Sequence, residues 1–290
     1  MVEPTVYING LFMPLSKAKI SILDRGFCYG DGLFETLRVN KGKIFCLERH
    51  IDRLFDSMSK VLIDLPMTRM ELTKVVQDTL ARNKFKNAII RLAVTRGDTH
   101  SHIQIDPDLP PTLVINIRPF TPLPKSVYKK GASIMLFRER ANITNGLKHR
   151  LKTSNYLSNI LIREQSEKKN FMEGVVVDPE FGVTEGTTSN IFIVEKGLIK
   201  TPPLSPYVLA GVTRQVILEI ARENKIPFLE ERITLDDLLN ADEVFITNSG
   251  IEIVPVIQVD SKYIGNKKPG ILTRFIHDEF LKCVEAYKNP

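Results

Sequence analysis

The stretch VVVDPEFGVTEGTTSNIFIV, residues 175–194, contains two runs of valine and isoleucine separated by the turn-forming segment PEFG. This pattern predicts a strand, a tight turn and a second strand. Glu185 lies in the second strand, immediately before Gly186, Thr187 and Thr188. These small neighbours leave room beside the carboxylate for a flat ligand ring, whereas a glutamate at the edge of a turn is more often simply in water. From this stretch alone, both interpretations of Glu185 stay open.

Strands and helices are expected on both sides of this hairpin. Helices are predicted at 49–65, 68–84, 155–169, 213–224 and 270–287, and further strands at 87–97, 112–117, 132–137, 173–178, 189–195 and 243–247. The chain of 290 residues exceeds the usual size of one domain, and the proline-rich segment 119–124 is typical of a linker. The sequence therefore predicts a mixed α/β (α+β) protein with one domain over 1–118 and a second over 125–290.

Lys152 lies in the stretch HRLKTSNYLSNIL, residues 149–161, just before one of the predicted helices. Lysine is usually a solvated charge, but a partly desolvated amine forms a Schiff base with a carbonyl group. Thr153 and Ser154 are of the helix-capping type, which predicts that Lys152 sits at the mouth of the helix rather than along its wet face. Lys148, four residues earlier, is a second candidate.

Three segments have the features of a phosphate site. Gly211 and Thr213 stand at a predicted helix start, where backbone N–H groups and the helix dipole attract an anion. The segment TNSG at 247–250 follows a strand and forms a second loop able to surround phosphate oxygens. Arg53 lies beside the apolar stripe of the first long helix, either as a surface arginine or as a phosphate clamp. An amine, a carboxylate and two phosphate loops are together what pyridoxal 5'-phosphate requires.

The composition argues against several other classes of protein. No run of about 18 apolar residues is present, so no membrane span is expected. The basic residues are scattered, so the net charge of +6 indicates small anionic ligands rather than nucleic acid. The three cysteines, Cys28, Cys46 and Cys283, have no histidine at ligand spacing and predict no metal site. An odd, small number of cysteines and the absence of a signal-like N-terminus favour the cytoplasm.

Seven blocks of the sequence resemble the class IV aminotransferases, the fold-type IV group of pyridoxal-phosphate enzymes. This group contains branched-chain aminotransferases, D-amino-acid aminotransferases and aminodeoxychorismate lyases. The resemblance covers essentially the whole chain, through the blocks DRGFCYGDGLFETLRV, HIDRL, IRLAVTRG, LKTSNYLSNIL, VTEGTTSNIF, LAGVTRQVI and FITNSGIEIVPV in this order. It implies a smaller N-terminal α/β domain, a larger C-terminal domain with a barrel-like sheet, and at least a homodimer.

The resemblance also implies a role for individual residues. The Schiff-base lysine of the family falls on Lys152 rather than Lys148, and its proton shuttle between substrate and cofactor makes it the catalytic residue. Glu185 falls on the partner of the pyridine nitrogen. Tyr156 is similar to a ring-contacting tyrosine that stands one residue further from the lysine in branched-chain enzymes. The implied cofactor-binding residues are Arg53, Lys152, Tyr156, Glu185, Val212, Thr213, Asn248 and Ser249.

Substrate-binding residues are implied at Phe34, Arg38 and Arg91. Branched-chain enzymes usually read FEGIR where this chain reads FETLR, so Thr36 replaces a glycine. Arg91 resembles the arginine of the branched-chain block YIRPL. In this chain Ile89 stands where that block has its tyrosine.

D-amino-acid enzymes carry an Arg-x-His pair shortly after the VTRG block. Here the segment 95–104, TRGDTHSHIQ, offers His100 and His102 but no matching arginine. We therefore expect a transaminase that exchanges the amino group between a branched-chain-like L-amino acid and a 2-oxo acid such as 2-oxoglutarate. The alternatives are a D-amino-acid aminotransferase, an aminodeoxychorismate lyase that releases pyruvate and 4-aminobenzoate, and a non-catalytic relative.

Overall fold

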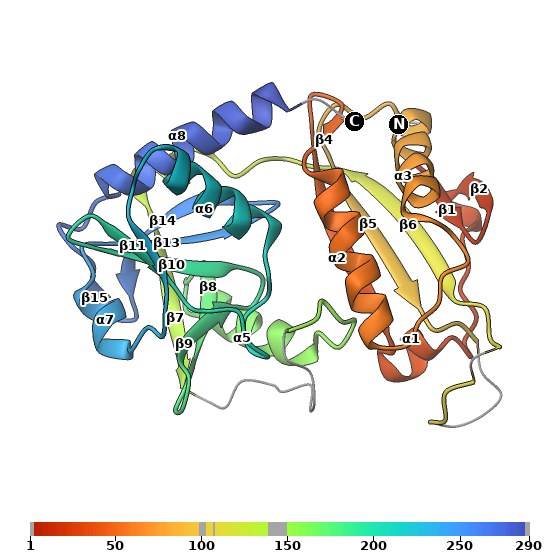
Figure 1. The fold of residues 1–290 in the computed structure, drawn as a ribbon, viewed down its shortest axis with the longest axis horizontal. Helices are drawn as coiled ribbons and strands as arrows, with labels where there is room; N and C mark the ends of the chain where they lie inside the picture. The colour runs from red at the N-terminus through yellow and green to blue at the C-terminus, as the bar shows by residue number, and fades with distance from the viewer. Residues whose placement is uncertain (1–2, 99–102, 107, 139–149, 288–290) are drawn as a thin grey trace. The chain divides into compact units, whose positions relative to one another are not determined.

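The computed structural model describes residues 3–98, 103–106, 108–138 and 150–287 (Figure 1). The chain forms two compact units. Unit 1 comprises Met1–Thr121, Leu151–Asn155 and Tyr287–Pro290, and unit 2 comprises Pro122–Arg150 and Tyr156–Ala286. The short segment that contains Lys152 therefore packs with the N-terminal part of the chain, although it lies far from that part in sequence.

Unit 1 is built on an antiparallel sheet of six strands in the order β2-β1-β6-β5-β3-β4. The strands are β1 (Thr5–Ile8), β2 (Leu11–Pro14), β3 (Gly32–Asn40), β4 (Lys43–Ile44), β5 (Ala88–Thr95) and β6 (Thr112–Pro119). The two strands predicted at 87–97 and 112–117 are confirmed as β5 and β6.

The helices of unit 1 are α1 (Arg25–Tyr29), α2 (Leu47–Lys60) and α3 (Arg69–Asn83), with a 3-10 turn η1 (Leu15–Lys17). The apolar stripe of α2 contacts β3, and α3 contacts β1 and β6, so both helices cover the same side of the sheet. A capping box between Thr68 and Glu71 starts α3. Both predicted helices are confirmed, but α2 ends at Lys60 instead of reaching residue 65, and Leu62 has a positive φ of 58°.

The alternation of side chains along β3 divides this sheet into two chemically different faces. Leu33 and Leu37 point toward the helices and are fully buried with their partners across the sheet. Phe34, Thr36 and Arg38 point to the opposite face. The register of the strands thus places three of the side chains discussed above on the side that the helices do not cover.

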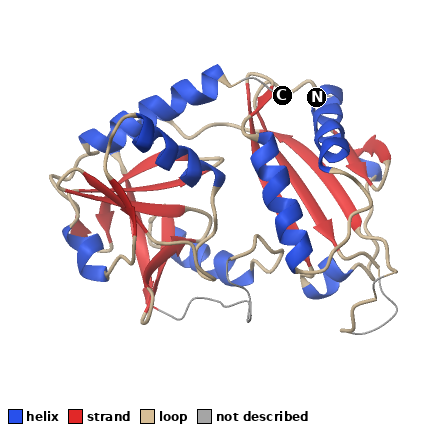
Figure 2. Ribbon diagram, viewed as in Figure 1, coloured by secondary structure: helices blue, strands red, loops and turns tan. Residues whose placement is uncertain are grey.

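Unit 2 contains a nine-stranded mixed sheet in the order β12-β11-β10-β13-β14-β7-β8-β9, with β15 paired to β14 (Figure 2). The strands are β7 (Ala132–Arg138), β8 (Glu173–Asp178), β9 (Gly182–Gly186), β10 (Asn190–Glu195), β11 (Leu198–Thr201), β12 (Phe228–Glu230), β13 (Glu243–Asn248), β14 (Glu252–Val259) and β15 (Lys262–Tyr263). The sheet curls into a half-barrel, and β9 at one end of the order also contacts β10. The predicted hairpin is confirmed as β8 and β9, but the predicted second strand is interrupted at residues 187–189 and continues as the separate strand β10.

The helices of unit 2 are α4 (Lys125–Lys130), α5 (Leu157–Lys168), α6 (Val212–Glu223), α7 (Leu235–Asn240) and α8 (Ile271–Ala286). Helix α5 packs on β7 and β8, while α6 and α8 pack on β13 and on each other. The three longer helices confirm the predictions at 155–169, 213–224 and 270–287 within two residues at each end. Among the residues that the structure describes, no helix has the length and apolar character needed to cross a membrane.

Candidate active site

Lys152 is held against β3 by main-chain hydrogen bonds. The N–H of Phe34 donates to the carbonyl of Lys152 at 2.9 Å, and the N–H of Ser154 donates to the carbonyl of Gly32 at 2.8 Å. The Lys152 Nζ lies 4.5 Å from the centre of the Phe34 ring. The expectation that Lys152 sits at a helix mouth is wrong, because Thr153 pairs with Leu33 in an extended bridge and α5 starts only at Leu157. The lysine is instead positioned by a sheet edge.

Arg53 is bound to a carboxylate that the sequence analysis missed. Glu35 of β3 points toward the helices, is 1% exposed, and accepts hydrogen bonds from Arg53 Nε at 2.7 Å and Arg53 Nη2 at 2.6 Å. His50 Nδ1 lies 2.7 Å from Glu35 Oε2. Burial acts to raise the pKa of Glu35, but the charge of Arg53 and the hydrogen bonds from His50 and Arg53 outweigh it and lower the pKa to about 2.

His50 is the uncharged member of this cluster. Burial lowers the pKa of His50, the Glu35 carboxylate opposes that shift, and the positive charges of Arg53 and Lys152 add to it. The Arg53 side chain keeps 15% exposure, whereas Glu35 and His50 are almost fully buried. Two features of the sequence indicate this cluster. Glu35 is a charged residue between Leu33 and Leu37 on the apolar face of a strand, and His50 and Arg53 are three residues apart on one side of the following helix.

The two arginines predicted to bind substrate lie on the face of the unit 1 sheet that the helices do not cover. Arg91 stands directly opposite Thr36 in the register of β3 and β5, is exposed, and places its Cζ 3.7 Å from the centre of the Phe34 ring. Arg38 is 7% exposed, with its Cζ 3.8 Å from the centre of the Phe120 ring. The structure therefore groups the predicted substrate residues Phe34, Arg38 and Arg91 on one surface. The same register adds Asn116 and Arg118, which sequence reasoning did not single out.

Glu185 is buried in unit 2, with 7% exposure, so the interpretation as a turn-edge glutamate in water is wrong. Its Oε1 lies 3.1 Å from Arg150 Nε. Its Oε2 accepts hydrogen bonds from the Leu209 N–H at 2.7 Å and from Asn190 Nδ2 at 3.2 Å. A buried carboxylate held by one cation and two neutral donors is positioned to stabilise a positive charge beside it.

Asn190 joins Glu185 to the two predicted phosphate loops. Its amide also donates to the Leu209 carbonyl at 3.0 Å, and its main chain pairs with Thr247 at the end of β13. A Cβ on Gly211 would lie 2.0 Å from Asn190 Oδ1, so only glycine allows the start of α6 to approach this closely. Sequence reasoning missed both Asn190 and Arg150, because neither follows from a periodic pattern.

The predicted phosphate residues lie at the ends of two elements of unit 2. Val212 and Thr213 form the first turn of α6, and within the described part of the chain no side chain caps the helix at Gly211. Their backbone N–H groups are therefore suited to an anion. Asn248 closes the loop after β13, because its Oδ1 accepts from the N–H groups of Gly250 and of the residue that follows it. Ser249 stands in this loop and is half-buried.

The remaining candidates are less well defined. Tyr156 is the N-cap of α5 and is half-buried. Lys148, His100 and His102 lie outside the described residues.

Comparison with known proteins identifies the family. The sequence model described as "Amino-transferase class IV" matches residues 32–259. A putative branched-chain-amino-acid aminotransferase of Methanocaldococcus jannaschii is 39% identical over 277 residues, covering 95% of this chain and 94% of the relative. The D-alanine aminotransferase of Staphylococcus haemolyticus is 34% identical over 286 residues, covering 97% and 98%.

Solved structures with the same fold include two enzymes of the group. The branched-chain amino acid aminotransferase of T.th., solved with pyridoxamine 5'-phosphate, has a TM-score of 0.91 at 26% identity and covers 97% of this chain and 93% of its own. The 4-amino-4-deoxychorismate lyase from Pseudomonas aeruginosa has a TM-score of 0.83 at 28% identity and covers 96% and 98%.

The fold and the family match define the class of this protein as a two-domain α/β enzyme of fold type IV. The chain belongs to the class IV aminotransferase family, as the resemblance of its seven blocks predicted, and the enzyme class predicted from the sequence is confirmed. Its relatives include branched-chain aminotransferases, D-alanine aminotransferases and an aminodeoxychorismate lyase.

Proposed function

We propose that the protein is a pyridoxal-5'-phosphate-dependent transaminase acting on a branched-chain-like L-amino acid and a 2-oxo acid such as 2-oxoglutarate. The observation that carries the proposal is the placement of Lys152. Main-chain pairing with β3 fixes its backbone, and its amine lies 4.5 Å from the Phe34 ring and close enough to His50 to influence that residue's pKa. An amine in a fixed, partly buried position beside an aromatic ring is suited to covalent and proton-transfer chemistry.

The residues present fit the cofactor in their donor chemistry. Arg53 and the first turn of α6, with Val212 and Thr213, offer cationic and N–H donors for a phosphate group. Glu185 offers a buried carboxylate for a protonated ring nitrogen. Contacts from Tyr156, Asn248 and Ser249 remain part of the proposal. When bound, pyridoxal phosphate supplies an electron sink that stabilises negative charge at the substrate Cα.

Lys152 and Glu185 have separate roles in the proposed reaction. The Lys152 amine takes the proton from the substrate Cα and returns a proton to the cofactor side, acting in turn as general base and general acid. Glu185 would hold the ring nitrogen of bound pyridoxal phosphate, and its contacts with Arg150, Leu209 and Asn190 fix the carboxylate for that role.

The surface formed by Phe34, Thr36 and Arg91 supports the choice of substrates. Phe34 and Ile89 lie on the same face of the sheet as Arg91, with 3% and 5% exposure, so the ground beneath the Arg91 guanidinium is apolar. The exposed guanidinium of Arg91 suits the second carboxylate of a dicarboxylic acceptor. The absence of an arginine between residues 97 and 104 favours L-substrates over D-substrates.

The decisive experiment combines a spectrum with a substrate panel. The purified protein with pyridoxal phosphate should show an absorbance band that changes on addition of L-leucine, and should form the 2-oxo acid from L-leucine faster than from D-leucine or D-alanine. Faster reaction of the D-isomers would replace the L-specific proposal, and pyruvate release from aminodeoxychorismate would support the lyase. No spectral change with any amino acid would contradict the whole proposal.

The role of Arg91 has its own test. Arg91→Met should raise the KM for 2-oxoglutarate about tenfold, the loss expected for one charge-assisted contact, and should change the KM for a monocarboxylic 2-oxo acid little. Arg69→Met, an exposed arginine paired with Asp52 and Asp56, is the matched control. Equal changes for both acceptors would remove Arg91 from the carboxylate site.

A homodimer is part of the proposal and is supported by exposed apolar side chains in unit 1. Ile22 is 77% exposed, Phe27 76% and Ile103 80%. Hydrogen bonds from Cys28 to the Ile22 carbonyl and from Arg25 to the Ile103 carbonyl bring their segments together. Apolar patches of this kind mark association surfaces. Light scattering that gives a monomer mass at micromolar concentration would contradict this part.

A further inference from the structure

A second buried carboxylate lies behind the turn that follows Glu185. Glu173, at the start of β8, is 1% exposed and accepts hydrogen bonds from the hydroxyls of three consecutive residues. Thr187 Oγ1 donates to Oε1, and Thr188 Oγ1 and Ser189 Oγ each donate to Oε2 at 3.1 Å. The hydroxyls of three successive residues thus bind the Glu173 carboxylate, which has no role in the proposed transamination.

The turn is packed directly on this carboxylate. The Gly186 N–H donates to the Ser189 carbonyl at 2.7 Å, and the Thr187 N–H donates to the Gly174 carbonyl at 3.0 Å. A Cβ on Gly186 would lie 2.3 Å from Ser189 Oγ and 3.0 Å from Glu173 Cγ, so a larger residue does not fit. Burying a carboxylate is costly unless charges or donors compensate it, and here the turn itself supplies three of the donors.

Glu173 is also stabilised from outside the turn. The N–H of Gly174 donates to Oε1 at 2.9 Å, and Arg163 Nη1 of α5 lies 3.7 Å from Oε2. Both contacts are independent of the hydroxyls, so removing a single hydroxyl leaves the carboxylate partly compensated. A substitution in the turn therefore reports on the turn rather than on the burial of the charge.

The same turn connects three groups of the candidate active site. Glu185 immediately precedes it, and Asn190, which follows it, donates to Glu185 at 3.2 Å. The carbonyl of Thr188 in its middle accepts a hydrogen bond from Asn248 Nδ2 at 3.0 Å. An unbroken series of hydrogen bonds therefore runs from Glu173 through Thr188 to the loop at 247–250.

We propose that Glu173 is a positioning residue for cofactor binding. Its carboxylate gathers the hydroxyls of residues 187–189 and so fixes Glu185 relative to the loop at 247–250. This inference rests on the proposed function, because pyridoxal phosphate is taken as the ligand of these groups. A glutamine at 173 would offer one acceptor oxygen in place of two, so it cannot accept from all three hydroxyls.

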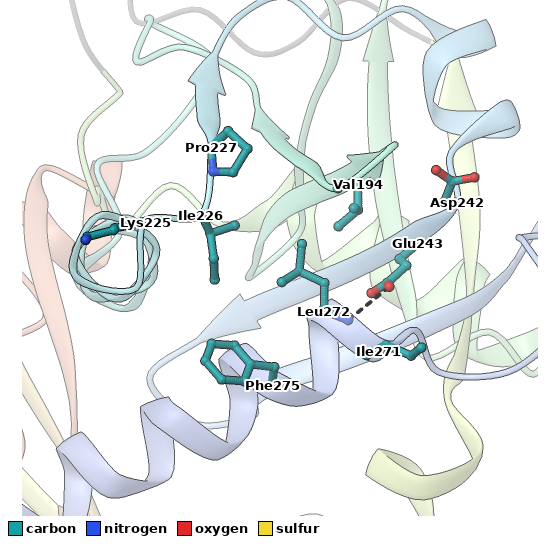
Figure 3. A pocket seen from close by; sticks show the side chains of 10 residues that line it. Val194, Lys225, Ile226, Pro227, Asp242, Glu243, Ile271, Leu272 and Phe275 are labelled. Atoms are coloured by element: carbon teal, nitrogen blue, oxygen red, sulfur yellow. Dashed lines mark hydrogen bonds between the residues drawn. The ribbon is translucent and has the colours of Figure 1, made fainter.

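The structure offers a matched control in the same unit. Glu243 also accepts three hydrogen bonds at the start of α8. The N–H of Leu272 donates at 3.0 Å (Figure 3). The N–H and the hydroxyl of Thr273 donate at 2.7 Å each. Glu243 begins β13, whereas Thr247, which pairs with Asn190, lies at its other end. Glu243→Gln therefore weakens a comparable set of three hydrogen bonds, on β13 instead of β8, without touching the turn at 186–189.

The test measures the affinity of the purified protein for pyridoxal phosphate by equilibrium dialysis, together with the melting temperature without cofactor. Glu173→Gln should raise the Kd about tenfold or more, while Glu243→Gln should lower the melting temperature with less than about a twofold change in Kd. Thr188→Val removes one hydroxyl donor with little change of shape and should give a smaller rise in Kd, which keeps the test valid if Glu173→Gln fails to fold.

Each other outcome counts against the inference. An unchanged Kd in Glu173→Gln and Thr188→Val, or an equal rise in Glu243→Gln, would reduce Glu173 to a folding role while leaving the proposed function intact. A wild-type protein that does not bind pyridoxal phosphate would overturn both the inference and the proposed function.

Discussion

Glu35 in unit 1 and Glu185 in unit 2 are both buried and both paired with an arginine, but they are held in different ways. Both oxygens of Glu35 are bound by side chains of one helix, through Arg53 and His50. Glu185 is instead held by Arg150, by the backbone N–H of Leu209 and by the amide of Asn190, which belong to three different segments of unit 2. The difference shows that unit 1 fixes its charge through the packing of one helix on one strand, whereas unit 2 relies on loops and on the ends of its elements.

The largest expected effect is the loss of turnover on substitution of Lys152, which unlike Glu35 and Glu185 is proposed to transfer the proton itself. Lys152→Ala removes the amine that carries the α-proton, so turnover should fall by a factor of about a thousand or more. Borohydride reduction of the wild type with pyridoxal phosphate, followed by peptide mapping, should place the label on residue 152.

Lys148→Ala is the control for this substitution and should retain activity within about twofold, as expected for a lysine that takes no part in the reaction. Equal loss in both variants would show that the lysine has been assigned to the wrong position.

The two arginine partners should differ in their contribution to stability. Arg53→Ala leaves Glu35 buried beside a neutral histidine, so the free energy of unfolding should fall by about 3–5 kcal/mol. Arg150→Ala leaves Glu185 with two neutral donors and some exposure, so about 1–3 kcal/mol is expected. Urea denaturation of both variants, without cofactor, measures the difference. A larger loss in Arg150→Ala would reverse the comparison.

Acid should weaken the Glu35 cluster in two steps. The lowered pKa of His50 means that the unfolded chain takes up its proton first, so stability falls as the pH drops below about 6.5. The pKa of Glu35, lowered from 4.5 to about 2, means that its contribution is complete above pH 4.5 and is lost as the pH falls toward 2.

Denaturation of Glu35→Gln between pH 7 and pH 3 tests the second step. The variant should be less stable than the wild type at pH 7, by up to about 3 kcal/mol, and the gap should narrow below pH 4.5. His50→Asn should instead flatten the stability curve where it begins to fall, just below pH 6.5. A gap between Glu35→Gln and the wild type that stays constant with pH would show that the carboxylate of Glu35 is not the stabilising form.

The contrast between Glu35 in unit 1 and Glu185 in unit 2 also separates what the sequence predicted from what it did not. Periodic patterns predicted α2, α3, β5 and the hairpin of β8 and β9, because one buried face imposes a regular spacing on residues near in sequence. Arg53 could be singled out on such a helix, and its partner Glu35 was detectable as a charge within an apolar alternation. The partners of Glu185 were not predictable. Arg150 is remote from Glu185 in sequence, and Asn190, although only five residues away, faces Glu185 because of the turn at 187–189, which no periodic pattern predicts.

The segment around Lys152 is the clearest case of tertiary contacts overriding a local signal. Thr153 and Ser154 have the residue types of a helix cap, but the edge of β3 offers main-chain partners that an isolated cap does not. Two backbone hydrogen bonds to a strand more than a hundred residues away therefore decide its conformation. Local propensity is a weak predictor wherever a sheet edge is available.

The smallest expected effect is a fall in kcat when the Asn190 side chain, which donates a hydrogen bond to Glu185, is displaced. Gly211→Ala keeps an ordinary backbone, with φ at −66°, but its Cβ would lie 2.0 Å from Asn190 Oδ1. The amide must move, and Glu185 loses one of its donors, so kcat should fall by about tenfold or less.

A double-mutant cycle with Asn190→Ala distinguishes this route from a direct effect on α6. If Gly211→Ala acts through the amide, adding it to Asn190→Ala should cost nothing further, because the group it displaces is already gone. Additive losses would instead mean that the start of α6 is disturbed by itself. In the described part of unit 1, no such indirect route exists for Glu35. Its carboxylate is bound by the side chains of Arg53 and His50, both on α2, so truncating either side chain removes a partner of Glu35 directly.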